Sequence, residues 1–223
     1  MWHRRSSESY INWIRSKGVK VGHSCYVQNT RHIDIDVSRP SLVEIGNHVF
    51  LHKNLSLITH DWASWCFVPL YNDFIPSHAK IVIGNNVWFG ESCTVLKGVT
   101  IGDNCIIGLG SIVTKDIPAN SVAIGRPAKV VCSIDEYYQK RKKQYRKELF
   151  DYASTLINNS NISKDDFKDD YILFVDASNY RQYDYPYSNV FSSEQFEIWK
   201  STHKKEFIGY EEFIEAVKKE RCC

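Results

Sequence analysis

The residues best suited to chemistry surround His60, in the hexapeptide LITHDW. A histidine side chain titrates near neutral pH, so it can remove a proton from a hydroxyl group as a general base. Such a base needs a partner that fixes the tautomer of its ring. Asp61 is adjacent in the chain, although neighbouring side chains often diverge. The competing carboxylates are Asp34, Asp36, Asp73 and Glu91. The sequence leaves this choice open, and a loop histidine bonded to the backbone is the alternative interpretation.

A six-residue repeat follows this histidine. From Ile83 to Pro118 the chain reads IGNNVW, FGESCT, VLKGVT, IGDNCI, IGLGSI and VTKDIP. Every first position is apolar, four of the six second positions are glycine, and the fifth positions are mostly small or β-branched. A period of six fits neither a helix nor a simple alternating strand. It predicts a β-solenoid, in which the first residue points inward, the glycine permits the corner and three short strands close each coil.

The same period is present upstream of the histidine. Apolar hexads start there at Val21, Ile45, Leu51 and Leu57. From 21 to 45 is 24 residues, or four hexads, so the phase is kept, but an irregular stretch is expected near Arg39-Pro40. From 57 to 83 is 26 residues, which is not a multiple of six. We therefore expect residues 61–80 to leave the repeat as a protruding loop.

The composition divides the 223 residues into two parts. Ten of the 11 glycines fall in residues 1–132, whereas 18 of the 30 aromatic residues fall in 133–223. A single uniform fold is therefore not expected. The sequence predicts an N-terminal helix over 1–18, a solenoid domain over 19–132 and a helical C-terminal extension over the remainder.

The extension contains the patterns of three helices. The first starts near Ser133, where Glu136 completes the spacing of a capping box. Two shorter helices are expected over 192–203 and 209–220. Six of the eight residues in 140–147 are basic, which is typical of a solvated helix face. A peripheral position at an acidic membrane surface is the second interpretation of this run.

Charge, hydropathy and cysteine usage bound the class of protein. The formal charge is +2, from 28 basic and 26 acidic residues, so nucleic acid is not expected as a partner. No run reaches the ~18 apolar residues of a membrane span, so no integral membrane segment is expected. Seven cysteines without CxxC spacing favour a reducing, cytoplasmic location over a disulfide framework.

The end of the repeat carries the most specific resemblance. The stretch GSIVTKDIPANSVAIGRPAKVV at residues 110–131 resembles the closing coil of the sugar O-acetyltransferases, such as the galactoside and maltose enzymes. These are hexapeptide-repeat acyltransferases, and the resemblance covers about residues 19–131. It implies a mainly β fold, a left-handed parallel β-helix. It also implies acetyl-CoA as co-substrate, no metal, and a homotrimer that holds coenzyme A between neighbouring subunits.

The resemblance assigns the chemistry to His60, as the general base that deprotonates an acceptor hydroxyl. Asp61, the carboxylate nearest to it in sequence, is the candidate catalytic partner, with the choice among the carboxylates left open. Cys93 and Cys105 occupy fifth positions of hexads, where a thiol is a small core residue. We therefore expect direct transfer of the acetyl group, without an acyl-enzyme.

The resemblance also implies how coenzyme A is held. Trp88 packs near the pantetheine arm, and the backbone at Gly90, Glu91 and Leu109 lines the tunnel. The polar and basic positions that match the phosphates and adenine are Thr114, Lys115, Arg126 and Lys129.

The acceptor is expected to be a saccharide, such as a surface-polysaccharide unit or its precursor. Aromatic rings stack on sugar faces, so Trp62, Trp65 and Tyr71 of the loop are candidate acceptor-binding residues. Burial of these rings against the next subunit is an equal alternative. Asn54, on the strand leading to His60, is a candidate hydrogen-bonding partner of the acceptor.

Three other functions remain open at this point. The acceptor group could be the amine of an amino sugar. The γ-class carbonic anhydrases share the solenoid and hold zinc with three histidines, for which His48, His52 and loosely His23 are candidates. A non-catalytic scaffold on the same solenoid is the third.

Overall fold

The computed structural model describes most of the chain. The described residues are 4–157, 163–167, 198–199, 201–202 and 206–221. They form two compact units, 1–139 and 140–223, and each is treated by itself. The short helix expected over 192–203 falls mostly outside the described residues.

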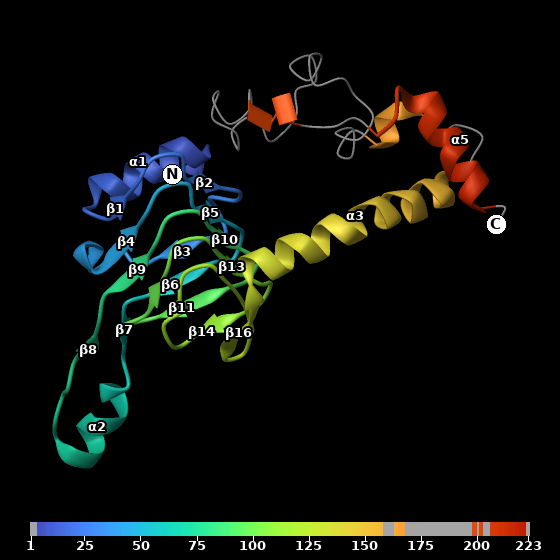
Figure 1. The fold of residues 1–223 in the computed structure, drawn as a ribbon. Helices are drawn as coiled ribbons and strands as arrows, with labels where there is room; N and C mark the ends of the chain where they lie inside the picture. The colour runs from blue at the N-terminus through green and yellow to red at the C-terminus, as the bar shows by residue number, and fades with distance from the viewer. Residues whose placement is uncertain (1–3, 158–162, 168–197, 200, 203–205, 222–223) are drawn as a thin grey trace. The chain divides into compact units, whose positions relative to one another are not determined.

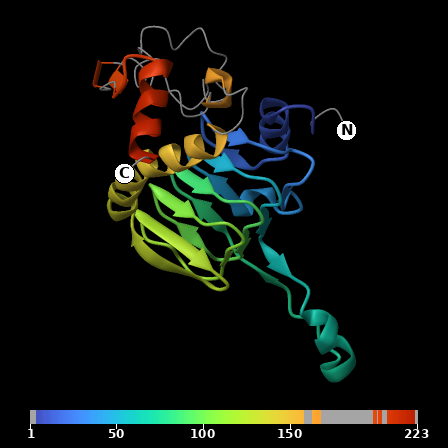
Figure 2. The ribbon, with the colours of Figure 1, turned by 90° about the vertical axis from the view of Figure 1, so that its right-hand side faces the viewer.

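Three β-sheets wrap the first unit, and we call them faces A, B and C (Figures 1 and 2). Face A contains β1 (Lys20–Val21), β4 (Val43–Ile45), β9 (Ile81–Ile83) and β12 (Thr100–Ile101). Face B contains β2 (Tyr26–Val27), β5 (Phe50–Leu51), β10 (Val87–Phe89), β13 (Cys105–Ile107), β15 (Ser121–Gly125) and β16 (Ala128–Ser133). Face C contains β3 (Asp34–Ile35), β6 (Ser56–Ile58), β11 (Thr94–Leu96) and β14 (Ile112–Val113). Neighbouring strands are parallel except β15 and β16, so the chain visits the three faces in turn and forms the predicted solenoid.

First-position residues of the hexads fill the interior of the solenoid. Ile45 pairs with Ile83, and Ile83 pairs with Ile101, which lies 18 residues or three hexads further on. The first-position side chains of the six consecutive hexads are at most 1% exposed. Each such side chain stabilises the stack by about 1.5–3 kcal/mol relative to an exposed one. The period of six thus predicted both the coil and its core.

The glycines at second positions have a different role from the one expected. The corner residues with positive φ include Asn86 (54°) and Asn104 (56°), at fourth positions, and the amide of Asn86 donates to Asn104 over 3.0 Å. At Gly84, by contrast, a Cβ would lie 2.8 Å from the backbone of Gly102 and Asp103. The expectation that these glycines form the corners was therefore wrong. They are required because the backbones of successive coils approach too closely for a side chain.

The chain leaves the regular repeat at both places where the hexad pattern predicted it. The first is the short 3-10 helix η2 (Pro40–Leu42), which follows Arg39. The second we call the excursion, residues 60–78 (Figure 1). It consists of β7 (His60–Asp61), α2 (Ser64–Tyr71) and β8 (Ser77–His78), with β7 and β8 paired antiparallel.

The N-terminal helix α1 (Ser7–Ser16) covers the first coil, as Figure 2 shows. A capping box fixes its start, since the N–H of Ser9 donates to the Oγ of Ser6 over 3.1 Å. Tyr10 and Ile14 are buried in the solenoid core. The helix therefore shields apolar side chains that the first coil would otherwise expose.

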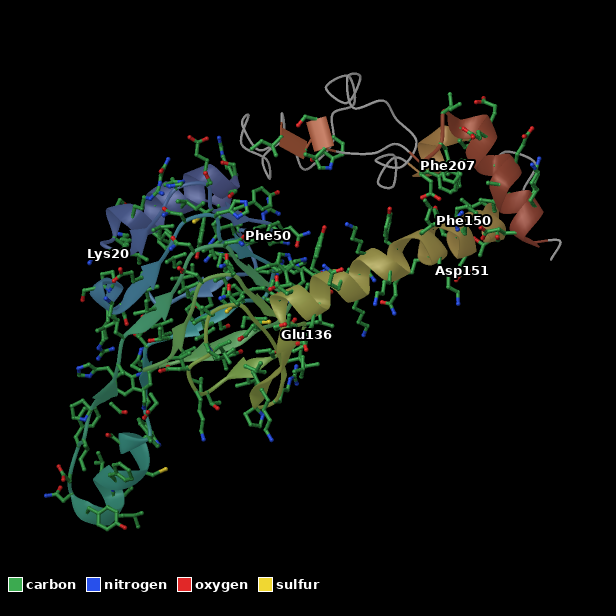
Figure 3. The ribbon with its side chains drawn as sticks, in the orientation of Figure 1. Lys20, Phe50, Glu136, Phe150, Asp151 and Phe207 are labelled. Atoms are coloured by element: carbon green, nitrogen blue, oxygen red, sulfur yellow. The ribbon has the colours of Figure 1, made fainter. Side chains whose placement is uncertain are left out.

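The second unit has a core of its own. It contains most of α3 (Ile134–Leu156), η3 (Lys164–Phe167) and α5 (Tyr210–Arg221). Helix α3 starts with the expected capping box, in which the N–H of Glu136 donates to Ser133 Oγ over 3.1 Å. The buried apolar residues of the second unit are Leu149, Phe150, Ala153, Phe167, Phe207, Phe213, Ile214 and Val217. The rings of Phe150 and Phe207, labelled in Figure 3, lie 6.1 Å apart. Over the described residues, no helix combines the length and hydropathy that crossing a membrane requires.

Candidate active site

His60 lies where the chain leaves face C for the excursion, at the edge between faces C and A. Its Nδ1 is 2.7 Å from Oδ2 of Asp36, which follows β3 on the preceding coil. Ile35 pairs with Leu57, and both side chains point into the core. Because side chains alternate along an extended chain, Asp36 and His60 both point outward, on neighbouring coils. The Asp36 side chain is 8% exposed and the His60 side chain 23%. The sequence left the carboxylate partner open among five candidates, and the structure places Asp36 there.

Asp36 is held as a carboxylate by its neighbours. The N–H and Oγ of Ser38 donate to Oδ1 over 2.9 and 2.6 Å, and the hydroxyl of the buried Thr59 donates to Oδ2. Burial raises the pKa of Asp36, but the hydrogen bonds from Ser38, Thr59 and His60 outweigh it and hold that pKa well below its usual range. An ionised carboxylate can only accept, so Nδ1 of His60 carries the proton. The Nε2 atom of the neutral ring is therefore free to take one.

Asp61 does not pair with His60, which corrects the assignment of the adjacent carboxylate. One of its oxygens forms an ion pair with Lys97, and the other accepts the N–H of Ala63 over 3.1 Å. Consecutive residues of β7 point to opposite sides of the strand, which separates the two side chains.

Aromatic side chains of the excursion surround one side of His60. The rings of His60 and Trp62 meet edge-on at 6.2 Å, and Phe74 lies 6.1 Å beyond Trp62. Trp65 and Tyr71 lie on α2 with most of their surface exposed, Trp65 by 82%. Of the three predicted acceptor-binding aromatics, Trp62 is the one that contacts the histidine.

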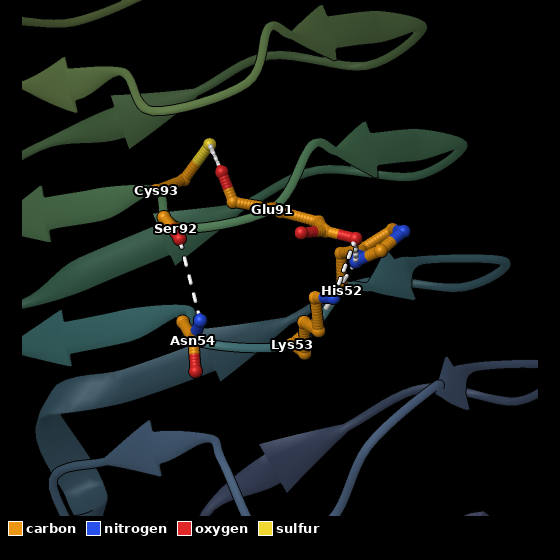
Figure 4. A network of polar contacts seen from close by, with 6 residues as sticks. All are labelled: His52, Lys53, Asn54, Glu91, Ser92 and Cys93. Atoms are coloured by element: carbon orange, nitrogen blue, oxygen red, sulfur yellow. Dashed lines mark hydrogen bonds and ion pairs between the residues drawn. The ribbon is translucent and has the colours of Figure 1, made fainter.

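The opposite edge of face C, where it meets face B, holds a second polar cluster (Figure 4). The Nζ of Lys53 lies 3.1 Å from Oε1 of Glu91, and Nδ1 of His52 lies 3.6 Å from the same oxygen. Asn54 donates to Ser92 Oγ over 3.4 Å. Asn54 thus lies at the other end of β6 from His60, and does not share a site with it within one chain.

The residues predicted to line the coenzyme A tunnel gather at this second edge. Trp88 points outward from β10, 41% exposed, with its ring 6.3 Å from that of His52. A Cβ on Gly90 would lie 2.6 Å from the backbone N of the exposed Leu109, so the two coils touch there. The N–H of Gly110 donates to the carbonyl of Glu91 over 2.7 Å.

The basic and polar positions are divided between the two edges. Arg126 donates from Nε to the carbonyl of Gly110 over 2.6 Å, which ties it to the edge with Trp88. Thr114 and Lys115 follow β14, and so lie on the edge that carries His60. Lys129 is exposed on β16 of face B. The predicted cofactor residues therefore do not converge on His60 within one chain.

Three polar residues of the site were missed by the sequence analysis: Ser38, Thr59 and Lys97. Ser38 carried a weak signal, because Asp-x-Ser commonly forms a local side-chain turn. The contacts of Lys97 and Thr59 depend on which residues of neighbouring coils lie side by side. Counting hexads through the irregular stretches of the chain does not give that register.

The histidines considered for a metal site do not meet. His48 and His52 lie at opposite ends of β5, and Nδ1 of His48 lies 3.1 Å from the amide oxygen of Asn86. In the part of the chain that the structure describes, no three His, Cys, Asp or Glu side chains are grouped as metal ligands.

Comparison with known proteins agrees with this architecture. The fold and repeat define a hexapeptide solenoid, and the family model described as bacterial transferase hexapeptide (six repeats) matches residues 80–115. Protein CapG of Staphylococcus aureus is 41% identical over 142 residues, which are 61% of this chain and 79% of that protein. The chain therefore belongs to the hexapeptide-repeat acyltransferases.

Two further relatives have described activities. The galactoside O-acetyltransferase of Escherichia coli K12 is 55% identical over 142 residues, 62% of this chain and 63% of that enzyme. A solved galactoside acetyltransferase in complex with coenzyme A is 30% identical. The match covers 59% of this chain and 73% of that one, with a TM-score of 0.43.

Proposed function

We propose that this protein is an acetyl-CoA-dependent O-acetyltransferase that acts on a saccharide hydroxyl, with His60 as the general base. The observation that carries the proposal is the 2.7 Å contact between Nδ1 of His60 and the ionised carboxylate of the largely covered Asp36 side chain. It leaves Nε2 as the ring nitrogen available to act as a base, on a ring that meets Trp62 edge-on. The names of the relatives, galactoside O-acetyltransferase above all, support acetyl transfer to a sugar.

In the proposed reaction, Nε2 of His60 removes the acceptor hydroxyl proton while that oxygen attacks the thioester carbonyl. A new C–O bond forms, and the carbonyl becomes an oxyanion. The C–S bond then breaks, and the imidazolium returns its proton to the leaving thiolate of coenzyme A. Asp36 stabilises the imidazolium between these two steps and keeps the ring in one orientation.

Direct transfer is favoured over an acyl-enzyme by the state of the internal cysteines. Cys93 and Cys105 are buried, and burial raises the pKa of both thiols. A thiol that stays protonated at neutral pH is a poor nucleophile. We therefore retain a mechanism in which donor and acceptor are bound together.

The division of the predicted residues between two edges supports a homotrimer. Asn54 and His60 lie on either side of β6, six residues apart, which is roughly 20 Å at about 3.3 Å a residue. A neighbouring copy that presents its edge with Trp88 and Leu109 to His60 would complete the donor site. We assign this assembly, and the left-handed winding of the coils, by analogy with the family.

The direct test uses the purified full chain with acetyl-CoA and two probe acceptors, p-nitrophenyl-β-galactoside and maltose. We expect free thiol to be released only when an acceptor is present, and mass spectrometry to locate one acetyl group on a sugar oxygen. Glucosamine is added as a third probe, and transfer only to its nitrogen would replace the O-acetyl assignment with N-acetylation. Failure to bind coenzyme A at millimolar concentration would overturn the proposal.

A further inference from the structure

The excursion is attached to the solenoid by a short two-stranded stalk. Its strands are β7 and β8, in which His60 pairs with His78 and Asp61 pairs with Ser77. An isolated ribbon of this length is not stable by itself. His60 is itself part of the stalk. The direction in which the stalk leaves face C therefore sets the position of the His60 ring and of the Trp62 and Phe74 rings that follow it.

A single cation from the next coil touches both strands of the stalk. Lys97 follows β11, whose Leu96 pairs with Ile58, so it lies beside the point where the chain departs. Its Nζ forms an ion pair with Asp61 and donates to the Oγ of Ser77. The Lys97 side chain is 30% exposed, so water only partly screens these contacts.

The contact with Asp61 extends into the rest of the excursion. The second carboxylate oxygen of Asp61 accepts the N–H of Ala63, the residue that precedes α2. Between them is Trp62, whose ring meets that of His60 edge-on at 6.2 Å. Lys97 thus fixes Asp61, and Asp61 fixes the turn that places Trp62 against the histidine.

We propose that Lys97 is a positioning residue for the acceptor side of the site. This proposal rests on the proposed function. By clamping β7 and β8 together, it sets the stalk so that Trp62 and His60 face the same acceptor. Loss of the clamp would leave the donor edge of face B and its Trp88 unchanged. A displacement of about 1 Å in a reacting group can cost 10²-fold in rate, so the effect on transfer should be large.

The test compares three variants of the full chain. Lys97→Met removes the cation but keeps the length of the side chain, and Lys97→Arg keeps the charge. Lys80→Met is the matched control, because the Lys80 ammonium pairs with Glu44 on face A and not with Asp61 or Ser77. Kinetics with acetyl-CoA and p-nitrophenyl-β-galactoside or maltose are combined with hydrogen exchange of the peptides that cover the excursion.

For Lys97→Met we expect kcat/KM for the probe acceptor to fall about 10- to 100-fold, with the KM for acetyl-CoA within about twofold. Exchange in residues 62–76 should rise, Lys97→Arg should recover most of the loss, and Lys80→Met should match the wild type. An unchanged kcat/KM, or an equal loss in the KM for acetyl-CoA, would overturn the proposal. If the wild type transfers no acetyl group, the proposed function fails, whereas the exchange data still decide whether Lys97 clamps the stalk.

Discussion

The two edges of face C each carry a histidine beside a carboxylate, but the two pairs differ in distance, in the exposure of the carboxylate and in the ring nitrogen that carries the proton. His60 lies 2.7 Å from Asp36, whose carboxylate is 8% exposed and receives three other hydrogen bonds. His52 lies 3.6 Å from Glu91, which is partly exposed and also paired with Lys53. A nearby carboxylate is therefore not enough to make a histidine a base.

The deciding difference is which ring nitrogen carries the proton. Nδ1 of His60 faces the Asp36 carboxylate, which can only accept a hydrogen bond, so Nδ1 must be protonated and Nε2 carries the lone pair. Nδ1 of His52 accepts the backbone N–H of Lys53 over 3.0 Å, so its proton is on Nε2. Burial and the charge of Lys53 lower the pKa of His52, against the opposing effect of Glu91. His52 is thus arranged as a hydrogen-bond donor, whereas the geometry at His60 fits the base that we propose.

The largest expected effect separates the two histidines directly. His60→Ala should lower kcat for acetyl transfer by about 10²–10⁴-fold, the usual contribution of a general base, and leave coenzyme A binding intact. His52→Ala should change kcat by less than about tenfold. Steady-state kinetics and calorimetric titration with coenzyme A measure both. Equal losses in the two variants would remove the distinction between the edges.

Asp36→Asn should have the second largest effect on activity. An amide can donate as well as accept, so it no longer forces the proton onto Nδ1 of His60. We expect kcat to fall on the order of 10²-fold while the KM for acetyl-CoA stays within about threefold. The far-ultraviolet circular dichroism spectrum checks that the variant is folded. Wild-type kcat in a folded Asp36→Asn protein would refute the orienting role.

The same substitution should reveal the pH dependence of stability. The folded pKa of Asp36 is depressed, so its contribution is present above the unfolded pKa of about 3.9 and is lost as pH falls below it. At pH 7, Asp36→Asn should lower the free energy of unfolding by about 1–3 kcal/mol. Urea denaturation at fixed protein concentration should show this difference shrinking at pH 3. A difference that is constant with pH would contradict the assignment.

The smallest effect is expected at the other edge. The ion pair between Lys53 and Glu91 is half-exposed, so Glu91→Gln should cost less than about 1 kcal/mol of stability. High salt should erase that difference, since screening weakens exposed pairs. Thermal unfolding at low and high salt measures it. A loss as large as that of Asp36→Asn would show that the two edges are equivalent after all.

Most of the fold could be predicted from the period of the sequence. Apolar residues every sixth position can be buried together only in a coil of three short strands, and the break in phase between Leu57 and Ile83 marked the excursion. The role of Gly84 could not be predicted in the same way. Its requirement comes from the backbone of the next coil, which a single hexad does not contain.

The site was predicted less completely than the fold. His60 could be proposed because it stands at the break in the repeat, where the family resemblance implies a catalytic histidine, but its partner could not be chosen. Asp36 is 24 residues away in sequence, and the irregular stretch around η2 hides the register that brings it beside His60. Asp61 was the nearest carboxylate, and it proved to be engaged by Lys97.

The tautomers of the two histidines test the central claim most directly. Nitrogen-15 NMR of the histidine-labelled protein above pH 8 distinguishes a protonated ring nitrogen from an unprotonated one, and single His→Ala variants assign the signals among the eight histidines. We predict that His60 carries its proton on Nδ1 and His52 on Nε2, and that Asp36→Asn weakens this preference at His60. A proton on Nε2 of His60 in the wild type would contradict the account, because that ring could not act as the base.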